Sequence, residues 1–381
     1  MATGFAKSRD VAGTKITSGR VSAYTIPTDK QPESDGTAEW NSTTIVIAEL
    51  TANGVTGLGY SYANEAAAKV AEELIQKEIL GHDAMDIPSL HSAMDRKVRN
   101  WGRPGLVASA ISAVDTCLWD LKARILQMPL LTLLGKVRDN ILAYGSGGFT
   151  SYTEKELLNQ LTCWADEGFS CVKMKIGTHP EQDVERVATV QKALKGKAQL
   201  YVDANGAYDR QQALHKAQQF GDLGVTWFEE PVTSDDRIGL HFMVERAPAV
   251  MKIAAGEYNY TLDEARLLIE AQAVDVMQTD VTRCGGVTNF IKIGNLCDIS
   301  HYPYSAHTAP SIHATLCCAL LPAMNVEYFH DHVRIEHMIF DGAITAKKGL
   351  LTPDLSAHGL GLSIKQADAQ KYQVSSSAIK Q

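Results

Sequence analysis

The sequence predicts an α/β fold in which a β/α barrel is joined to an α+β domain. Three observations lead to this prediction. The 381 residues are 45% hydrophobic and 21% charged, which suits a large globular core. Residues 1–140 place short β-like runs before helical patterns, whereas residues 141–330 alternate short apolar runs with amphipathic stretches. Eight such alternations, joined by right-handed crossovers, give a parallel sheet that can close on itself.

The first 140 residues predict strands followed by helices. Strand-like runs lie at 21–26, 43–49 and 57–62, and the pair Asn53-Gly54 between the last two is a strong hairpin signal. Helical spacing of apolar residues follows at 65–79 and 106–126. The glycine-rich tail at 342–364 lacks the β/α rhythm, and we expect it to return to the first domain. The predicted domains are therefore 1–140 together with 331–381, and 141–330.

The barrel segment contains eight strand candidates. Two of the intervening helices carry clear start signals, because Thr153 with Glu156 and Thr261 with Glu264 have the spacing of a capping box. The strand candidates are 142–144, 171–176, 199–203, 227–229, 252–255, 275–278, 304–307 and 326–329.

Composition argues against several classes of protein. Lys and Arg total 36 and Asp and Glu total 44, so the formal net charge is -8 and nucleic-acid binding is not expected. No apolar stretch approaches the roughly 18 residues of a membrane span, and the N-terminal residues lack the apolar run of a secretion signal. We therefore predict a cytoplasmic protein without membrane partners. The seven cysteines are odd in number and never spaced as CxxC, which predicts buried reduced thiols.

Ionisable residues fall at the ends of successive predicted barrel strands. Active sites of β/α barrels are built at the carboxyl ends of the strands, so these side chains are expected to converge on one face. Any one of them alone could be a solvated loop charge, but seven strands in succession argue against that interpretation. The residues are Lys173, Lys175, Asp203, Glu229, Glu257, Asp280, His307 and Glu327.

Strand periodicity puts the two lysines on the same face. Lys173 and Lys175 alternate with Val172, Met174 and Ile176, so if the apolar residues pack against the outer helices the lysines point into the barrel mouth. Burial and a neighbouring cation both lower the pKa of a lysine, as a base near neutrality requires. The alternative is that each lysine forms a buried ion pair with a carboxylate.

Asp203, Glu229 and Glu257 are predicted to bind a divalent cation. Three gathered carboxylates repel one another, and Mg²⁺ resolves this while leaving positions for water and substrate. Glu230 follows Glu229 directly and is expected to point to the other face, so it is a weaker ligand candidate. Asn205 could donate to a substrate hydroxyl, or it could be a turn amide.

Asp280 and His307 form a candidate acid/base pair. A carboxylate beside an imidazole fixes its tautomer and stabilises the imidazolium. The histidines outside this pair, among them His301, His313, His330 and His332, are interpreted as structural. Arg283 could add positive charge near the substrate, or it could be a surface loop residue.

The order and spacing of these motifs resemble the enolase superfamily, and within it the mandelate racemase subgroup. Asp280 distinguishes this subgroup from the muconate cycloisomerase branch, which is similar but carries a lysine after strand six. The resemblance implies a modified TIM barrel of the (β/α)7β type with an α+β capping domain built from the N-terminal segment and the tail. The matching pieces are VKMKIG at 172–177, VDANG at 202–206, WFEEP at 227–231, GE at 256–257, DVTRCGG at 280–286, SAH at 305–307 and VE at 326–327.

The resemblance also implies roles. Asp203, Glu229 and Glu257 would bind one Mg²⁺ per subunit, and Lys175 and the His307-Asp280 pair would be acid/base catalysts on opposite faces of the substrate. Lys173 would bind the substrate carboxylate and depress the pKa of Lys175. Glu327 would hydrogen-bond the developing oxyanion. Relatives of this kind are often oligomers, so a homo-oligomer is expected.

These roles imply removal of the α-proton of a small carboxylate substrate to give an enediolate. The expected outcome is dehydration of a sugar acid, an aldonate or aldarate, to a 2-keto-3-deoxy acid. Racemisation or epimerisation of a 2-hydroxy acid is the alternative, and a non-catalytic metal-binding barrel is a further one. Substrate specificity is expected in capping-domain loops at 28–40, which include Trp40, and at 60–64, with Arg103 as a candidate clamp for a second carboxylate. Each could instead be an ordinary surface loop.

Overall fold

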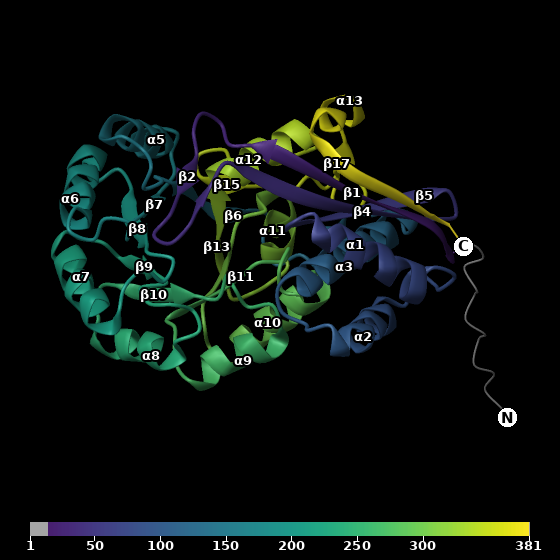
Figure 1. Cartoon of the computed structure of the whole chain (residues 1–381), viewed down its shortest axis with the longest axis horizontal. Coiled ribbons are helices and arrows are strands. Elements are labelled where there is room, and N and C mark those ends of the chain that lie inside the picture. The colour runs from purple at the N-terminus through teal and green to yellow at the C-terminus, as the bar shows by residue number, and fades with distance from the viewer. Residues whose placement is uncertain (1–13, 381) are drawn as a thin grey trace.

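The computed structural model describes residues 14–380 and confirms the predicted barrel (Figure 1). Its eight parallel strands follow one another around the barrel in chain order, and the last strand pairs with the first to close it. In the register, Lys175 lies opposite Asp203, and Asp203 lies opposite Glu229. The strands are β6 (Ile141–Gly147), β7 (Cys171–Lys175), β8 (Gln199–Asp203), β9 (Trp227–Glu229), β10 (Lys252–Ala255), β11 (Val276–Thr279), β12 (Tyr304–Ala306) and β13 (Ala323–Phe329).

Helices surround the barrel and bury the outward faces of its strands. Val172, Met174 and Ile176 belong to this outer core, as the alternation in β7 predicts. Thr153 and Thr261 both form the expected capping boxes, with Glu156 and Glu264. The helices are α5 (Glu154–Asp166), α6 (Asp183–Leu194), α7 (Arg210–Asp222), α8 (Arg237–Arg246), α9 (Leu262–Glu270), α10 (Val287–Ile299) and α11 (Pro310–Cys317).

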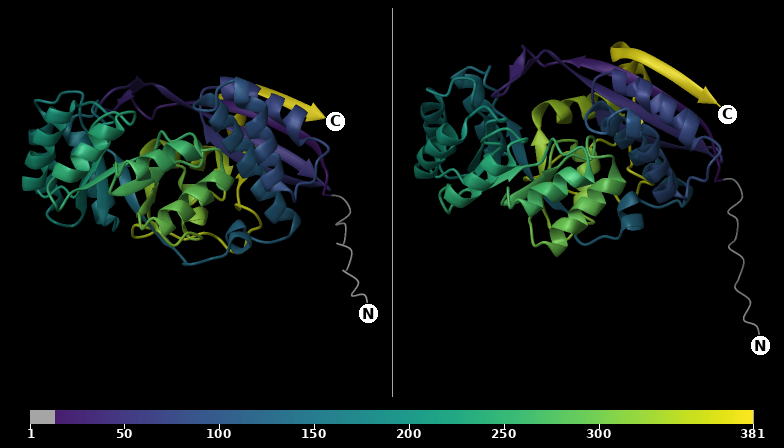
Figure 2. Two further views of the ribbon diagram at one scale, coloured as in Figure 1. Left: turned by 90° about the horizontal axis from the view of Figure 1, so that it is seen from below. Right: turned by 60° about the horizontal axis from the view of Figure 1, so that its bottom comes forward.

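The N-terminal domain is an antiparallel sheet with helices packed against it (Figure 2). Asn53 and Gly54 connect two of its strands with φ angles of 51° and 73°, as expected for a tight hairpin turn. The sheet order is β17 (Gln373–Lys380), β1 (Ile16–Pro27), β4 (Ser42–Ala52) and β5 (Val55–Tyr62). The helices are α1 (Ala66–Leu74), a π-helical turn at Ile75–Ile79, α2 (Ile87–Lys97), a 3-10 turn at Val98–Asn100, α3 (Leu106–Ile125) and α4 (Leu130–Leu134).

The C-terminal tail is divided between the two sheets. β15 (Leu350–Leu351) pairs with β6 of the barrel, whereas β17 pairs with β1 of the N-terminal sheet. Between them lie β14 (Phe340–Asp341), β16 (Ser363–Ile364), α13 (Gln366–Ala369) and a 3-10 turn at Gln370–Tyr372.

Helix α12 (His330–Ile339) follows the last barrel strand and faces the N-terminal sheet. The Tyr60 hydroxyl donates to Glu336 over 2.5 Å, and the Thr43 hydroxyl donates to Asp331 over 2.6 Å. Arg334 donates to the carbonyl of Pro27. The helix after the eighth strand therefore ties the barrel to the N-terminal domain, which fits the modified barrel that the resemblance implies.

A short hairpin of the N-terminal domain covers one side of the barrel mouth. It consists of β2 (Glu33–Ser34) and β3 (Glu39–Trp40), and it reaches across to the barrel strands near α5 and α6 (Figure 2). Thr150 donates its hydroxyl to the carbonyl of Asp35 over 2.9 Å. A Cβ on Gly36 would overlap the carbonyl oxygens of Ile176 and Ala204, so only glycine allows this close seating. We call residues 33–40 the mouth hairpin.

Glu33, at the base of the mouth hairpin, is expected to make folding stability fall as the pH rises. Burial, and then Asp331, raise its pKa from 4.5 to about 8, while it accepts a hydrogen bond from Trp40 over 3.2 Å. The folded state therefore keeps a proton that the unfolded state releases, so stability declines between about pH 4.5 and pH 8.

Urea unfolding from pH 5 to pH 9 measures this effect. The stability of wild type relative to Glu33→Gln should fall up to about pH 8 and then level off, because glutamine mimics the neutral carboxyl. Glu39→Gln, an exposed position in the same hairpin, is the control and should follow wild type. The prediction would be contradicted if the free energy of unfolding changed with pH in the same way in wild type and in Glu33→Gln.

The prediction for the cysteines is partly wrong. All seven are free thiols and five are buried, but Cys163 is exposed and Cys171 is half-buried. Cys163 lies on the outer face of α5, whose buried face is formed by Leu157, Leu161 and Trp164. Separately, none of the helices among residues 14–380 combines the length and apolar character needed to cross a bilayer.

Candidate active site

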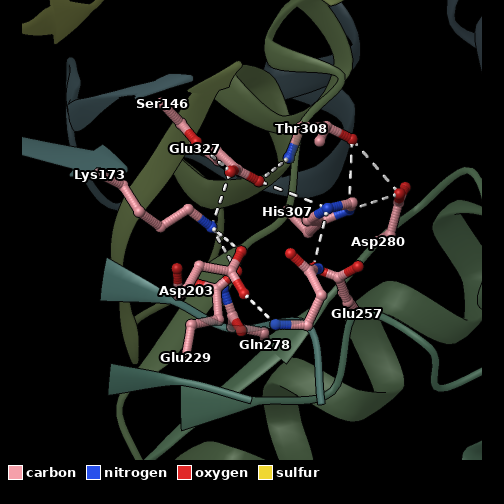
Figure 3. A network of polar contacts seen from close by, with 12 residues as sticks. Ser146, Lys173, Asp203, Glu229, Glu257, Gln278, Asp280, His307, Thr308 and Glu327 are labelled. Atoms are coloured by element: carbon pink, nitrogen blue, oxygen red, sulfur yellow. Dashed lines mark hydrogen bonds and ion pairs between the residues drawn. The ribbon is translucent and has the colours of Figure 1, made fainter. Parts of the chain in front are cut away.

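Three carboxylates meet at the carboxyl ends of neighbouring strands (Figure 3). Asp203 ends β8, Glu229 ends β9, and Glu257 lies two residues after β10. One oxygen atom from each lies within 4.8 Å of the others, and all three side chains are buried. Buried carboxylates this close repel one another unless cations neutralise them. Burial and the charge of Asp203 raise the pKa of Glu229 to about 8, which reflects this repulsion.

The donor set fits a hard divalent cation. It consists only of carboxylate oxygens from three separate strand ends, and Mg²⁺ prefers such ligands with water or substrate in the remaining positions. Asp203, Glu229 and Glu257 would hold the ion. In this structure, Lys173 and Lys175 form ion pairs with two of these carboxylates, Asp203 and Glu229.

Trp227 orients one of these carboxylates. Its indole N–H donates to Oε2 of Glu229 over 3.0 Å, and the ring is fully buried in the barrel floor with Tyr144 and Tyr201. Hydrogen bonds that orient metal ligands typically change metal affinity by about 10- to 100-fold when they are lost.

The Trp227→Phe variant, which removes the N–H but keeps an aromatic ring, is therefore expected to bind Mg²⁺ about 10- to 100-fold more weakly in isothermal titration calorimetry. Trp164→Phe, at a buried tryptophan in α5, is the control and should bind as wild type. Unchanged affinity of Trp227→Phe would show that the indole does not orient the ligand.

Lys173 is completely buried among the carboxylates. Its Nζ forms ion pairs with Glu229, with Glu327 at 2.8 Å and with Asp203 at 3.1 Å, and it lies 5.5 Å from the centre of the Tyr144 ring. The buried ion pair that the sequence left open as an alternative is thus what the structure contains for this lysine.

Lys175 also points inward, where Nζ lies 2.6 Å from Asp203 and donates to Asn205 over 3.1 Å. Burial and Lys173 each act to lower its pKa, as expected, but the expected net decrease is not found. Burial does lower the pKa, but attraction by Asp203, and by Glu257 and Glu327, outweighs it, so the pKa is raised. The sequence showed the second lysine but not how closely the carboxylates surround both.

His307 and Asp280 form the expected pair. His307 Nδ1 lies 2.9 Å from Asp280 Oδ2, and the other Asp280 oxygen accepts from the backbone N–H of Thr282 over 2.7 Å. His307 Nε2 faces Glu257 at 3.1 Å and Glu327 at 3.5 Å. Burial lowers the pKa of His307, but Glu257, Glu327 and Asp280 together raise it to about 10.

Glu327 accepts hydrogen bonds from both sides of the site. The Ser146 hydroxyl donates to it over 2.6 Å and the Thr308 backbone N–H over 3.2 Å, and Lys173 pairs with it (Figure 3). Burial raises the pKa of Glu327, but Lys173 and His307 lower it overall, so it is a carboxylate here. Donating to an oxyanion would require it to take up a proton.

Sequence reasoning missed Ser146, and it counted Thr308 only as a polar residue around the site and not as a partner of Glu327. Ser146 lies near the carboxyl end of β6, the one barrel strand to which no site residue was assigned. A search for any polar residue at each strand end, rather than for ionisable ones, would have found it. Thr308 follows His307, and only the turn after β12 brings its N–H to Glu327.

The expected orientation of Glu230 is wrong, although its rank as the weaker ligand candidate agrees with the carboxylate cluster, which does not include it. Strand alternation predicts that it points away from Glu229, yet it is buried beside Asp203 and Glu257, and its Oε1 has no hydrogen-bond partner. The physical reason is its backbone, because β9 ends at Glu229 and Glu230 has a φ of 39°. Alternation holds only within an extended strand.

Arg283 and Asn205 line the site. Arg283 donates to the carbonyl of Glu257 over 3.2 Å, lies 3.6 Å from Asp280 and stacks on Tyr258. Asn205 has a φ of 46° and offers its side-chain oxygen to Lys175, so it is both a turn residue and part of the site. It borders a cavity of about 460 Å³ with polar walls, lined among others by Thr37, Arg237, Tyr258, Asn259 and Tyr260.

Trp40 and Arg103 lie farther from the carboxylates. Trp40 bonds to Glu33 and packs edge-on against Phe149, with 5.6 Å between ring centres. Arg103 pairs with Asp95 at 2.7 Å and lines a separate cavity of about 620 Å³ between α2, α3 and the barrel. Pro104 and Tyr260 border both cavities.

Comparisons with known proteins cover nearly the whole chain. The family model described as Mandelate racemase / muconate lactonizing enzyme, N-terminal domain matches residues 22–135, and the model described as Enolase C-terminal domain-like matches residues 156–369. Arabinonate dehydratase of Saccharolobus solfataricus is 31% identical over 347 residues, which cover 87% of this chain and 91% of that protein.

Two solved structures are similar over the full architecture. A mandelate racemase/muconate lactonizing enzyme-like protein from Rubrobacter xylanophilus is 44% identical with a TM-score of 0.92, covering 94% of this chain and 100% of that one. L-talarate/galactarate dehydratase from Salmonella typhimurium LT2, liganded with Mg and L-lyxarohydroxamate, is 27% identical with a TM-score of 0.90, covering 100% of this chain and 98% of that one. The family models and the 31% identity to a relative along most of both chains show that this chain belongs to the enolase superfamily, in the mandelate racemase subgroup.

Proposed function

We propose that this chain catalyses the dehydration of a sugar acid, an aldonate or an aldarate, to a 2-keto-3-deoxy acid. The chain is a lyase of its superfamily, and its cofactor is Mg²⁺. One observation carries the proposal. Lys175 from β7 and the His307-Asp280 pair after β12 and β11 lie on either side of the three-carboxylate cluster, so two proton-transfer groups flank one metal site.

The chemistry requires both groups. The α-proton of a carboxylate is very weakly acidic, and its removal places a second negative charge on the carboxylate oxygens. When bound, Mg²⁺ supplies positive charge that stabilises the enediolate and weakens the attraction of the carboxylates for Lys175. Lys175 takes the α-proton, and Lys173 and Arg283 add positive charge around the substrate carboxylate.

His307 completes the elimination. The electron pair of the enediolate returns to form the carbon–carbon double bond and expels the β-hydroxyl, which takes a proton from His307 and leaves as water. The resulting enol tautomerises to the 2-keto acid. Asp280, which is not one of the three proposed metal ligands, favours the charged form of His307, the imidazolium, and that form is an acid. Asp280 holds its ring in place.

The polar side chains that line the cavity beside the site suit a polyhydroxylated substrate. The cavity beside Asn205 is lined by Tyr258, Asn259, Tyr260 and Thr37, whose polar groups can pair with hydroxyls. The relatives named arabinonate dehydratase and L-talarate/galactarate dehydratase act on acids of this class.

A panel of mono- and diacid sugars tests the proposal. Each is incubated with wild type and Mg²⁺ in deuterium oxide, and both 2-oxo-acid formation and α-hydrogen exchange are recorded. Dehydration predicts a 2-oxo acid from at least one member. Exchange with inversion at the α-carbon but no 2-oxo acid would instead identify a racemase or epimerase, and neither signal from any member would contradict sugar acids as the substrate class.

A further inference from the structure

His313 is buried in α11 and hydrogen-bonds through both ring nitrogens. The backbone N–H of Val281 donates to its Nε2 over 3.0 Å, so this nitrogen is an acceptor. Its Nδ1 lies 2.7 Å from the carbonyl oxygen of Thr308, which can only accept, so Nδ1 carries the proton. The geometry thus fixes one neutral tautomer.

These two bonds join the loops that carry the acid/base pair. Val281 follows Asp280 in the loop after β11, and Thr308 follows His307 in the loop after β12. The pairing of β11 with β12 ends at Thr279 and Ala306, and one further backbone hydrogen bond, from the N–H of His307 to the carbonyl of Thr279 over 3.1 Å, lies beyond it. Beyond it, the imidazole of His313 links the backbone of Val281 to that of Thr308, one residue after Asp280 and one residue after His307, and the Thr308 hydroxyl also donates to Asp280 over 3.3 Å.

The backbone after His307 needs such support. Thr308 and Ala309 have φ values of 55° and 37°, in the left-handed region that side chains other than glycine disfavour. Conformations of this kind persist at functional sites only when surrounding contacts hold them. Two contacts hold it here. His313 donates to the Thr308 carbonyl, and Glu327 accepts from the Thr308 N–H, the second of which is drawn in Figure 3.

We propose that His313 is a positioning residue. Its two hydrogen bonds, which we call the clasp, link the loops after β11 and β12 and so keep Asp280 and His307 within hydrogen-bonding distance of each other. Its importance for turnover rests on the proposed function, whereas the clasp itself does not. Sequence reasoning treated His313 only as a structural histidine.

The environment of His313 supports a permanently neutral ring. Burial lowers its pKa to about 4, and His307 also lowers it, although Asp280, Glu327 and the Thr308 bond act in the other direction. The ring of Phe290 from α10 packs against the His313 ring, with 5.0 Å between the ring centres. Neither bond is therefore lost by titration across the neutral range.

The clasp can be tested first on unmodified protein without substrate. In wild type labelled with ¹⁵N-histidine, NMR should show His313 as the neutral Nδ1–H tautomer from pH 6 to pH 9. A charged ring or the Nε2–H tautomer in that range would overturn the proposal whether or not a substrate is known.

Variants then test what the clasp does. His313→Phe keeps the contact with Phe290 but removes both bonds, and His313→Gln restores one donor and one acceptor. We expect His313→Phe to lower kcat by about 100-fold, because displacing a reacting group by roughly 1 Å has an effect of this size. KM and the affinity for Mg²⁺ should stay within about threefold of the wild-type values. The downfield Nδ1 proton signal of His307 should shift or disappear, and His313→Gln should recover at least tenfold of the lost rate.

His91→Phe is the matched control. His91 is a buried histidine that hydrogen-bonds to the carbonyl of Gly285, farther along the loop after β11. The His91→Phe substitution should leave both kcat and the Nδ1 proton signal of His307 unchanged. The proposal fails if His313→Phe keeps its kcat and the His307 signal, if Mg²⁺ affinity falls in parallel with kcat, or if His313→Gln is no better than His313→Phe. If His313→Phe does not fold, His313→Gln must still show the His307 signal.

Discussion

Replacing His307 with asparagine is expected to slow dehydration by about 1000-fold, within the range that a positioned general acid contributes. In the proposed mechanism, this variant loses the imidazolium that protonates the departing β-hydroxyl. Lys175 remains, so the α-hydrogen of the substrate should still exchange with solvent deuterium. The expected result is therefore exchange without loss of water, measured by NMR alongside 2-oxo-acid formation.

His301→Asn is the control for this experiment. His301 is an exposed histidine with a φ of 61°, a conformation that asparagine accepts readily, so the substitution should change neither rate. If His307→Asn lost exchange as well as dehydration, His307 would be the base rather than the acid. If it kept full dehydration activity, His307 would have no role in proton transfer.

Removal of Mg²⁺, or substitution of the proposed ligand Asp203, is expected to reduce turnover by at least about 10³-fold, since a metal contributes several kcal/mol of charge stabilisation. It should also lower stability. Mg²⁺ at 100 times its Kd stabilises the folded state by about 2.7 kcal/mol if only that state binds it. The proposed source of the gain is that Mg²⁺ bound at the cluster would offset the repulsion among Asp203, Glu229 and Glu257.

Urea unfolding with and without Mg²⁺ measures the stability effect, and 2-oxo-acid formation measures turnover. Asp203→Asn should lose both the stabilisation and the activity, while Asp222→Asn, an exposed position at the end of α7, should keep both. Equal Mg²⁺ stabilisation of wild type and Asp203→Asn would show that the ion binds elsewhere.

Periodicity was enough to predict the architecture. Short apolar runs alternating with amphipathic stretches identify the strands, because a parallel strand buried on both faces must be apolar and each crossover helix must bury one face. The ends of the strands then locate the candidate site, since a closed parallel barrel brings all its carboxyl ends together. Lys173 and Lys175 could be placed inside the barrel from strand alternation alone.

Contacts between separate loops could not be predicted in this way. Glu230 turned into the site because the chain leaves the strand with a positive φ, where alternation no longer applies. The division of the tail between β15 and β17 depends on which strand residues other strands leave unpaired on one side, such as Ile141 and Leu142 of β6, which β7 does not reach. Neither property is encoded in the spacing of residues along the chain.

The sequence by itself determined the fold class, the order of the strands and the set of ionisable residues at the barrel mouth, because these follow from local periodicity and from the closure of a parallel sheet. Only the tertiary structure decided the charge state of Lys175, the network of Ser146 and Thr308 around Glu327, and the clasp of His313. The physical reason is that electrostatic and hydrogen-bond energies depend on distances between groups on different strands and on their shared burial, and folding alone sets both.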